Sequence, residues 1–317
     1  MKLLASSRLF PSLVLFILSL ACIEYAFGWN EVLVPWGAVS PDMLILAAIL
    51  TVISYGIRAF RLYDYFFIGT RHCRFTTCLK LTLLHNLFNN LLPMRTGEAS
   101  FTILMARYFA IPPPCSVIAL LWFRLMDLHI LSAVALVVVG INWLGAWFLG
   151  LMTVTWLLLP FGLFQLQQTS ILDKMIKRVL VLSRWRSHLV VALSGLPQTK
   201  AAFWRAWFWT LLNWLVKLAV FSWILQLFSP LSATAALLGV IGGDLTSVLP
   251  IHGIAGAGTY EAGVVAAMVP FGVSVTQALV AAINMHLFML GLSIAGGGMA
   301  LLLSHDPNTT KLLQNHG

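Results

Sequence analysis

The stretch NNLLPMRTGEAS, residues 89–100, places amides, a proline, a glycine and two charges between apolar runs. Asparagine, proline and glycine end helices and form turns. The runs on either side, 79–92 and 99–111, are each about 13 residues, or roughly 20 Å as helix. Such arms are short of the ~30 Å hydrocarbon core of a bilayer. The stretch therefore predicts the tip of a helical hairpin over residues 79–111, either re-entrant or made of two short spans.

The composition predicts an all-α polytopic membrane protein that forms a single membrane domain over residues 1–317. The 317 residues are 60% hydrophobic and only 9% charged, whereas a soluble domain carries roughly 25% charged residues. The net charge is +9, but the basic residues fall in loops between apolar runs. This fits the positive-inside bias and contact with anionic lipid headgroups, and no nucleic-acid partner is expected. The four cysteines match no zinc or redox spacing, so no metal or cofactor is expected.

The apolar runs indicate about six full spans and a second hairpin. Residues 10–27 follow a basic N-terminus and are long enough for an uncleaved first span rather than a signal peptide. The second hairpin, 231–271, has longer arms and an irregular centre, LPIHGIAGAGTYEAG at 249–263. The candidate spans are 10–27, 43–60, 116–139, 143–164, 206–228 and 275–303.

Charge in the connecting loops sets the predicted orientation. We expect a cytoplasmic loop at Arg58, Arg61, Arg71, Arg74 and Lys80. Residues 165–205 form a basic cytoplasmic segment, and 171–194 has the pattern of an amphipathic helix on the inner leaflet. Counting crossings between these loops makes hairpin 79–111 begin and end inside and hairpin 231–271 begin and end outside. Both termini are then cytoplasmic.

The two halves, 1–140 and 143–303, have the same predicted order of elements with opposite starting sides. Each reads span, span, hairpin, span. The tips also correspond, with Leu-Leu-Pro and then Gly-Glu-Ala in the first and Val-Leu-Pro and then Tyr-Glu-Ala-Gly in the second. This pattern predicts an inverted-topology repeat, which is typical of transporters.

Ionisable groups at membrane depth are costly unless paired or hydrated, so they are candidates for function. In the first hairpin these are Arg95 and Glu98, and Arg124 and Asp127 lie three residues apart on one face of the next span. One interpretation is structural: Arg95 pairs with Glu98, and Arg124 with Asp127. The other puts the arginines on a phosphate. The predicted substrate-binding set of the first half is Asn86, Asn90, Arg95, Glu98, Arg124 and Asp127.

The second tip supplies His252 and Glu261 to the same predicted site. Glu261 has no partner close in sequence, so we expect it to meet a residue of the first half. We expect His286 to be a hydrogen-bonded structural group and Lys217 to extend towards an interface. Glycines permit unusual backbone angles and close approach at the two tips; they are Gly97, Gly253, Gly256 and Gly258.

NNLLPMRTGEA, FRLMDL and LPIHGIAGAGTYEAG together resemble the lysylphosphatidylglycerol synthase transmembrane-region family, also called flippase-like domain proteins. The resemblance covers about residues 10–303, and the chain looks like a stand-alone member without the soluble synthase domain, so lysyl transfer is not expected. Other members often carry a further Arg after Gly-Glu and one in the last span; here those regions hold Ser100 and Phe101, and Asn284 and His286. The residues that fall on the family motifs are Asn90, Pro93, Arg95, Gly97, Glu98, Arg124, Asp127, Gly256, Gly258 and Glu261.

The resemblance implies a lipid transporter or flippase in a bacterial inner membrane, for an anionic phospholipid or a polyprenyl-phosphate-linked lipid, and not an enzyme. One alternative is a non-transporting membrane accessory that presents lipid to a glycosyltransferase or lipid synthase, which would then be its partner. A less favoured alternative is an intramembrane lipid-modifying enzyme. No catalytic nucleophile or nucleotide-binding fingerprint accompanies the polar residues.

Overall fold

The structure is a computed structural model. It describes residues 28–68, 73–92, 96–141, 143–167, 191–246 and 254–303, with a few positions between 14 and 25. Within these ranges every regular element is a helix. The elements are α2 (Trp29–Ala38), α3 (Pro41–Phe67), α4 (Phe75–Leu91), α5 (Thr96–Phe109), α6 (Pro113–Gly140), α7 (Ala146–Gln167), α10 (Lys200–Phe228), α11 (Ala233–Thr246), η2 (Ile254–Gly256), α12 (Thr259–Met268), η3 (Val269–Phe271) and α13 (Val275–Leu302).

Four helices, α3, α6, α10 and α13, are long and apolar enough to cross a membrane, which makes the chain a polytopic membrane protein. They confirm four of the predicted spans. The predicted span 143–164 corresponds to α7, whose apolar part is shorter, over Ala146–Gly162. The predicted span 10–27 and the amphipathic helix at 171–194 lie almost entirely outside the described residues.

The helix α3 shows how these sequences suit an apolar solvent. Its branched side chains Ile45, Ile49 and Ile53 recur every fourth residue and are at least half exposed, whereas Thr51 and Ser54 on the inner side are buried. A soluble helix has the opposite pattern. Large apolar groups facing outward and small or polar groups facing neighbouring helices are expected where lipid surrounds the protein.

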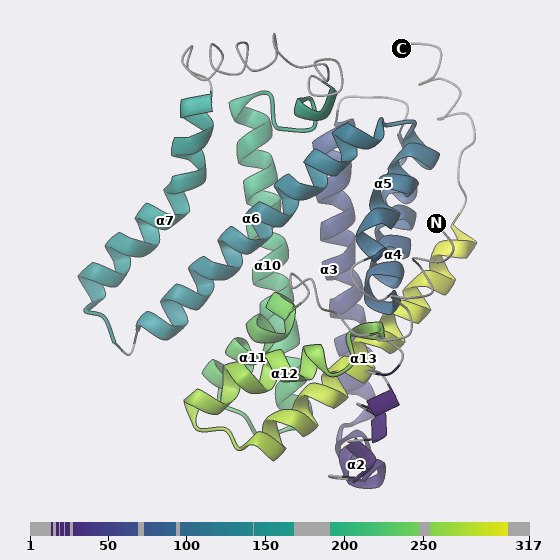
Figure 1. The fold of residues 1–317 in the computed structure, drawn as a ribbon, viewed down its shortest axis with the longest axis vertical. Coiled ribbons are helices and arrows are strands. Elements are labelled where there is room, and N and C mark those ends of the chain that lie inside the picture. Colours follow the sequence, from purple (N-terminus) through teal and green to yellow (C-terminus); the bar gives the residue numbers. More distant parts are fainter. Residues whose placement is uncertain are drawn as a thin grey trace.

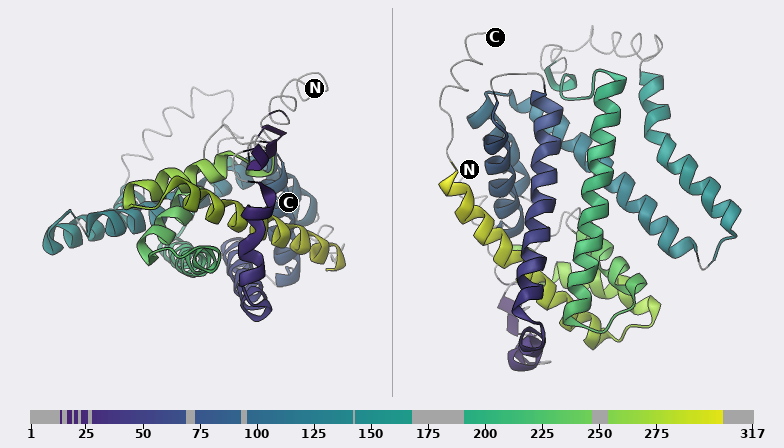
Figure 2. Two further views of the ribbon diagram at one scale, coloured as in Figure 1. Left: turned by 90° about the horizontal axis from the view of Figure 1, so that it is seen from below. Right: turned by 180° about the vertical axis from the view of Figure 1, so that it is seen from behind.

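The helices α3 and α10 run antiparallel through the middle of the molecule (Figure 1). The pair α4 and α5 lies at the end where α3 finishes and α10 begins. The pair α11 and α12 lies at the other end, near α2 (Figures 1 and 2). From the centre, α6 extends towards the lower left of Figure 1 and α13 towards the upper right. The two helix pairs therefore point towards each other from opposite ends of the molecule.

Both predicted hairpins are present as closely packed helix pairs, α4 with α5 and α11 with α12. In the first, a Cβ at Gly97 would collide with the backbone of Asn89. In the second, Gly242 and Gly263 face each other, and a side chain on either would meet the backbone of its counterpart. Glycine allows this close approach because it has no Cβ.

Two elements differ from the prediction. The helix α3 does not end near residue 60 but continues to Phe67, so Arg58 and Arg61 belong to a membrane helix and not to a cytoplasmic loop. The loop predicted before α3 contains a further helix, α2, which packs on α13 through Trp36. The indole Nε1 of Trp36 donates to Asn284 Oδ1 at 2.7 Å. Asn284 therefore fixes α2 on the last span.

Candidate functional site

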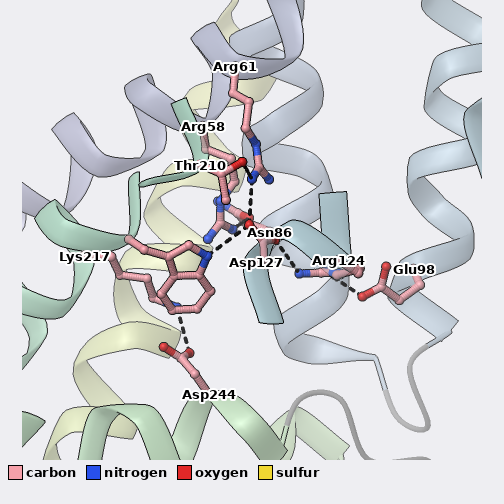
Figure 3. A network of polar contacts seen from close by, with 10 residues as sticks. Arg58, Arg61, Asn86, Glu98, Arg124, Asp127, Thr210, Lys217 and Asp244 are labelled. Atoms are coloured by element: carbon pink, nitrogen blue, oxygen red, sulfur yellow. Dashed lines mark hydrogen bonds and ion pairs between the residues drawn. The ribbon is translucent and has the colours of Figure 1, made fainter. Parts of the chain in front are cut away.

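A cavity of ≈ 130 Å³ lies at the centre of the molecule between the two hairpins. The first hairpin contributes Asn89 and Asn90, and the second contributes Ala255 and Gly256. The central helices α3 and α10 and the sloping helices α6 and α13 also line it. Its charged lining residues come from four different helices and are Arg58, Arg124, Asp127, Lys217 and Asp244. Figure 3 shows this polar network.

Arg58 lines the cavity, and its guanidinium is hydrogen-bonded to the side-chain amide of Asn86. Its Nη1 donates to Asn86 Oδ1 at 2.8 Å. Among the residues that the structure describes, no carboxylate lies within 4.0 Å of its guanidinium. A guanidinium stays charged in any protein environment. Arg58 is thus a positive charge at membrane depth without a carboxylate partner in this part of the chain, and its fork of donors suits an anion.

Two buried donors next to Arg58 also have no partner among the described residues. They are the Nδ2 amide nitrogen of Asn86 and the Nε of Arg124, and both residues line the cavity. Buried polar groups in native structures are nearly always satisfied by protein, water or ligand. With the Arg58 guanidinium, these unused donors make one wall of the cavity suited to a group that accepts several hydrogen bonds.

Asp127 is held in a structural role by residues outside its own helix. Its Oδ1 accepts from Arg61 Nη1 at 2.6 Å and from Trp214 Nε1 at 3.0 Å. Arg61 also donates to Thr210 at 3.1 Å and lies over the Phe123 ring. The side chains of Arg61 and Asp127 are 6% and 11% exposed. This buried pair ties α3, α6 and α10 together, because each ion would be costly without the other.

Arg124 joins α6 to the first hairpin. Its Nη2 lies 2.6 Å from Glu98 Oε1, and its Nη1 is 3.8 Å from Asp127 Oδ2. The predicted pairing of Arg124 with Asp127 is therefore the weaker of its two contacts. The Arg124 side chain is 30% exposed, much more than that of Arg61. It can reach the cavity while the acid at the start of α5 holds it.

The prediction that Lys217 extends towards an interface is wrong, because its ammonium group points into the protein. Its Nζ lies 2.7 Å from Asp244 Oδ1. The ammonium group also lies over the rings of Trp214 and Phe221, 4.9 and 5.1 Å from their centroids. These aromatic faces stabilise a cation that water cannot fully solvate. Lys217 therefore places a charge on the cavity wall opposite the first hairpin.

The second tip is fastened to α13 by His286. The Nδ1 of His286 is 2.6 Å from Glu261 Oε1, and its Nε2 is 2.7 Å from the carbonyl oxygen of Ala255. The other oxygen of Glu261 accepts from the Gly258 backbone N–H at 2.8 Å and caps α12. The expectation that Glu261 meets a residue of the first half is thus wrong. Its partner belongs to the second half because α12 packs on α13.

The remaining predicted residues are placed as follows. Asn90 Nδ2 donates to Ser293 Oγ at 2.6 Å and joins the first hairpin to α13. Gly256 and Gly258 have φ of 76° and 81°, values that favour glycine and turn the chain at the second tip. Arg95, His252 and Gly253 lie outside the described residues. The sequence assigned other roles to four residues of the site, Arg58, Arg61, Lys217 and His286, and it did not single out Trp214.

Comparison with known proteins gives one family. The family model described as "Lysylphosphatidylglycerol synthase TM region" matches residues 7–297. No curated protein and no solved structure is significantly similar to the chain.

Proposed function

Because the chain belongs to the lysylphosphatidylglycerol synthase transmembrane-region family, we propose that it moves a lipid with an anionic headgroup across a bacterial inner membrane. The observation that carries the proposal is the central cavity, in which Arg58 and two unused donors face a space shared by both hairpins. The headgroup is that of a phospholipid or of a polyprenyl-phosphate-linked lipid. Its phosphate accepts hydrogen bonds from Arg58, Asn86 and Arg124.

The proposal includes re-entrant hairpins. The arms α4 and α5 have 17 and 14 residues, which is about 25 and 21 Å of helix, against ~30 Å of hydrocarbon. The arms α11 and α12, with 14 and 10 residues, are shorter still. Irregular backbone at membrane depth is stable where it lines a cavity filled with water or polar ligand. Each tip then closes the cavity from one side of the membrane.

Matched contacts in the two halves support an inverted repeat. Arg58 of α3 reaches Asn86 of α4, 28 residues on, and Lys217 of α10 reaches Asp244 of α11, 27 residues on. In each half, the second arm of the hairpin also carries a glutamate that contacts a basic residue of the following long helix. These glutamates, Glu98 and Glu261, lie 26 and 25 residues before their partners.

Such a repeat gives a simple route for alternating access. The contacts of one hairpin with its long helices break and re-form while those of the other hold. A headgroup bound at Arg58 then faces each side in turn, and the acyl or prenyl chains stay in the surrounding lipid. Because positive charge near the start of α4 and α10 favours the cytoplasmic side, we propose that this end of the molecule, and with it both termini, is cytoplasmic.

The test is transbilayer movement of labelled lipids in liposomes that contain the purified protein. A short-chain fluorescent anionic phospholipid on the inner leaflet should become accessible to a membrane-impermeant quencher faster than in empty liposomes. Replacement of Lys200, an exposed residue at the start of α10, by alanine is the matched control and should keep the full rate. Rates equal to those of empty liposomes across anionic phospholipids and prenyl phosphates would exclude transport.

The alternative of an accessory that presents lipid to a partner enzyme predicts a different result in the same liposomes. Such a protein binds the headgroup but does not move it. Cysteines placed at Asn89 and Ala257 would then label to the same extent with and without lipid. In a transporter, the labelling of these two tip positions should change in opposite directions when lipid is added.

A further inference from the structure

The two halves make the same contact with different chemistry. In the first half Glu98 meets Arg124, and in the second Glu261 meets His286, both at 2.6 Å. Arginine cannot be deprotonated in a protein, whereas histidine changes its charge between about pH 5 and 8. One of two equivalent contacts is therefore permanent, and the other depends on a proton.

The geometry around His286 shows which proton matters. Its Nε2 faces the carbonyl oxygen of Ala255, which can only accept, so Nε2 carries a hydrogen. Its Nδ1 faces a carboxylate oxygen of Glu261 at 2.6 Å. If Nδ1 had no hydrogen and Glu261 were ionised, two lone pairs would meet at that distance and repel. The contact therefore exists only while one proton lies between Nδ1 and Oε1.

This proton controls how the second tip is held. Glu261 caps α12 through Gly258, and Ala255 sits in a left-handed conformation with φ of 55°, which is unusual for a residue with a side chain. The side chains of His286 and Glu261 are 9% and 10% exposed. Loss of one proton from the pair leaves a neutral imidazole with a single N–H, which can donate to Glu261 or to the Ala255 carbonyl oxygen but not to both. The tip formed by residues 254–261 would then loosen from α13.

The other charged and titratable groups near His286 also belong to the cavity. Tyr260 of α12 packs on its ring, with centroids 4.8 Å apart. The element α4 faces it with amides, and α2 meets α13 further along, at Asn284. The charged and titratable groups that share the cavity with His286 are Tyr55, Arg58, Arg124, Asp127, Lys217, Asp244 and Tyr260.

From this asymmetry we propose that His286 and Glu261 form a proton-binding site that couples lipid movement to a proton gradient. The inference rests on the proposed function and adds its energy source. The pair takes one proton from the cavity, which is open past the first tip while the second tip closes on α13, and it releases that proton to water on the second tip's side when the tip opens. The contact of Glu98 with Arg124 opens and closes without a proton. One proton is thus carried for each passage of a headgroup.

The first test follows the tip itself and needs no transport. Hydrogen–deuterium exchange of residues 254–262 is compared with that of residues 96–104 in the same sample, between pH 5.5 and 8. The second tip should lose protection relative to the first as the pH rises. His286→Arg should abolish this difference, because it makes the contact permanent. His129→Gln, which replaces another buried histidine stacked on Trp156, should retain it. Equal behaviour of both tips at every pH would overturn the proposal.

The second test measures coupling in liposomes with a gradient of one pH unit. With one proton per lipid, the labelled lipid should accumulate up to about tenfold in one leaflet, and reversal of the gradient should reverse the accumulation. Glu261→Gln should let lipid move without accumulation. Movement by the wild type that ignores the gradient would refute coupling but leave transport standing. Absence of any movement would refute transport, and the exchange experiment would still decide whether the tip binds a proton.

Discussion

Replacement of Arg58 by glutamine should reduce the rate of transbilayer lipid movement by about ten- to a hundredfold, because hydrogen bonds to a charged group contribute roughly 1.5–3 kcal/mol. Glutamine keeps a donor near Asn86 but removes the positive charge. The side chain is only partly buried and has no carboxylate partner among the described residues, so the variant should remain folded. The rate is measured by quenching of labelled anionic lipid in liposomes.

The specific result for Arg58 depends on the headgroup. A labelled zwitterionic lipid has no net negative charge to attract the Arg58 guanidinium. Its rate of movement should therefore fall less in the glutamine variant than that of an anionic lipid. The Lys200→Ala variant loses one positive charge at a position that does not line the cavity, so it should move lipid at the wild-type rate. If the glutamine variant moved anionic lipid at the wild-type rate while remaining folded, Arg58 would not be the headgroup ligand.

Replacement of Asp127 by leucine should destabilise the protein by about 3–5 kcal/mol, because it leaves the buried guanidinium of Arg61 without its partner. The double variant Arg61→Met and Asp127→Leu should recover most of this loss, since no buried ion is then left unpaired. Unfolding of each variant in mixed detergent micelles measures the free energy difference. Leu125→Met, at an exposed position of α6, should stay within about 0.5 kcal/mol of wild type.

The double variant also separates structure from function at this pair. Arg61 and Asp127 bind each other, and the cavity keeps Arg58 and Arg124 without them. We therefore expect the stabilised double variant to move lipid at a measurable rate. If the double variant were as unstable as Asp127→Leu alone, the unpaired charge of Arg61 would not be the cause of the lost stability.

The helical hairpins could be predicted from the sequence because two physical limits act on them together. Proline and glycine end a helix, and a 13-residue arm is too short for the bilayer. These limits are local, so NNLLPMRTGEAS was sufficient to locate α4 and α5, and the second tip was found in the same way. Gly256 and Gly258 were expected to adopt unusual backbone angles, and their φ values are positive.

The most important cation could not be found in this way. Arg58 and Arg61 lie at the end of an apolar run, followed by more basic residues, which is the usual pattern of a cytoplasmic loop. The structure continues α3 to Phe67 and turns both side chains inward. Only tertiary packing separates an inward-facing arginine from a loop arginine. Alignment of the two halves matches Arg58 and Asn86 with Lys217 and Asp244. This match is the sequence signal that points to an inward-facing Arg58.

The partner of Glu261 was missed for a related reason. Sequence spacing indicates a lone carboxylate at Glu261, and it indicates a structural histidine at His286 without linking the two residues. The separation of 25 residues between them nearly equals the 26 between Glu98 and Arg124. A hairpin and the following span make contacts between residues that are far apart in the sequence. The contact in the first half predicts the one in the second half only when the two halves are aligned.

An experimental structure in lipid nanodiscs that contain an anionic phospholipid tests the central claim most directly. The account predicts headgroup density inside the cavity between the two tips, with a phosphate oxygen within about 3 Å of the Arg58 guanidinium and further donors from Asn86 and Arg124. Density for the headgroup only at the outer rim of the molecule, with the cavity filled by water or closed by side chains, would contradict it.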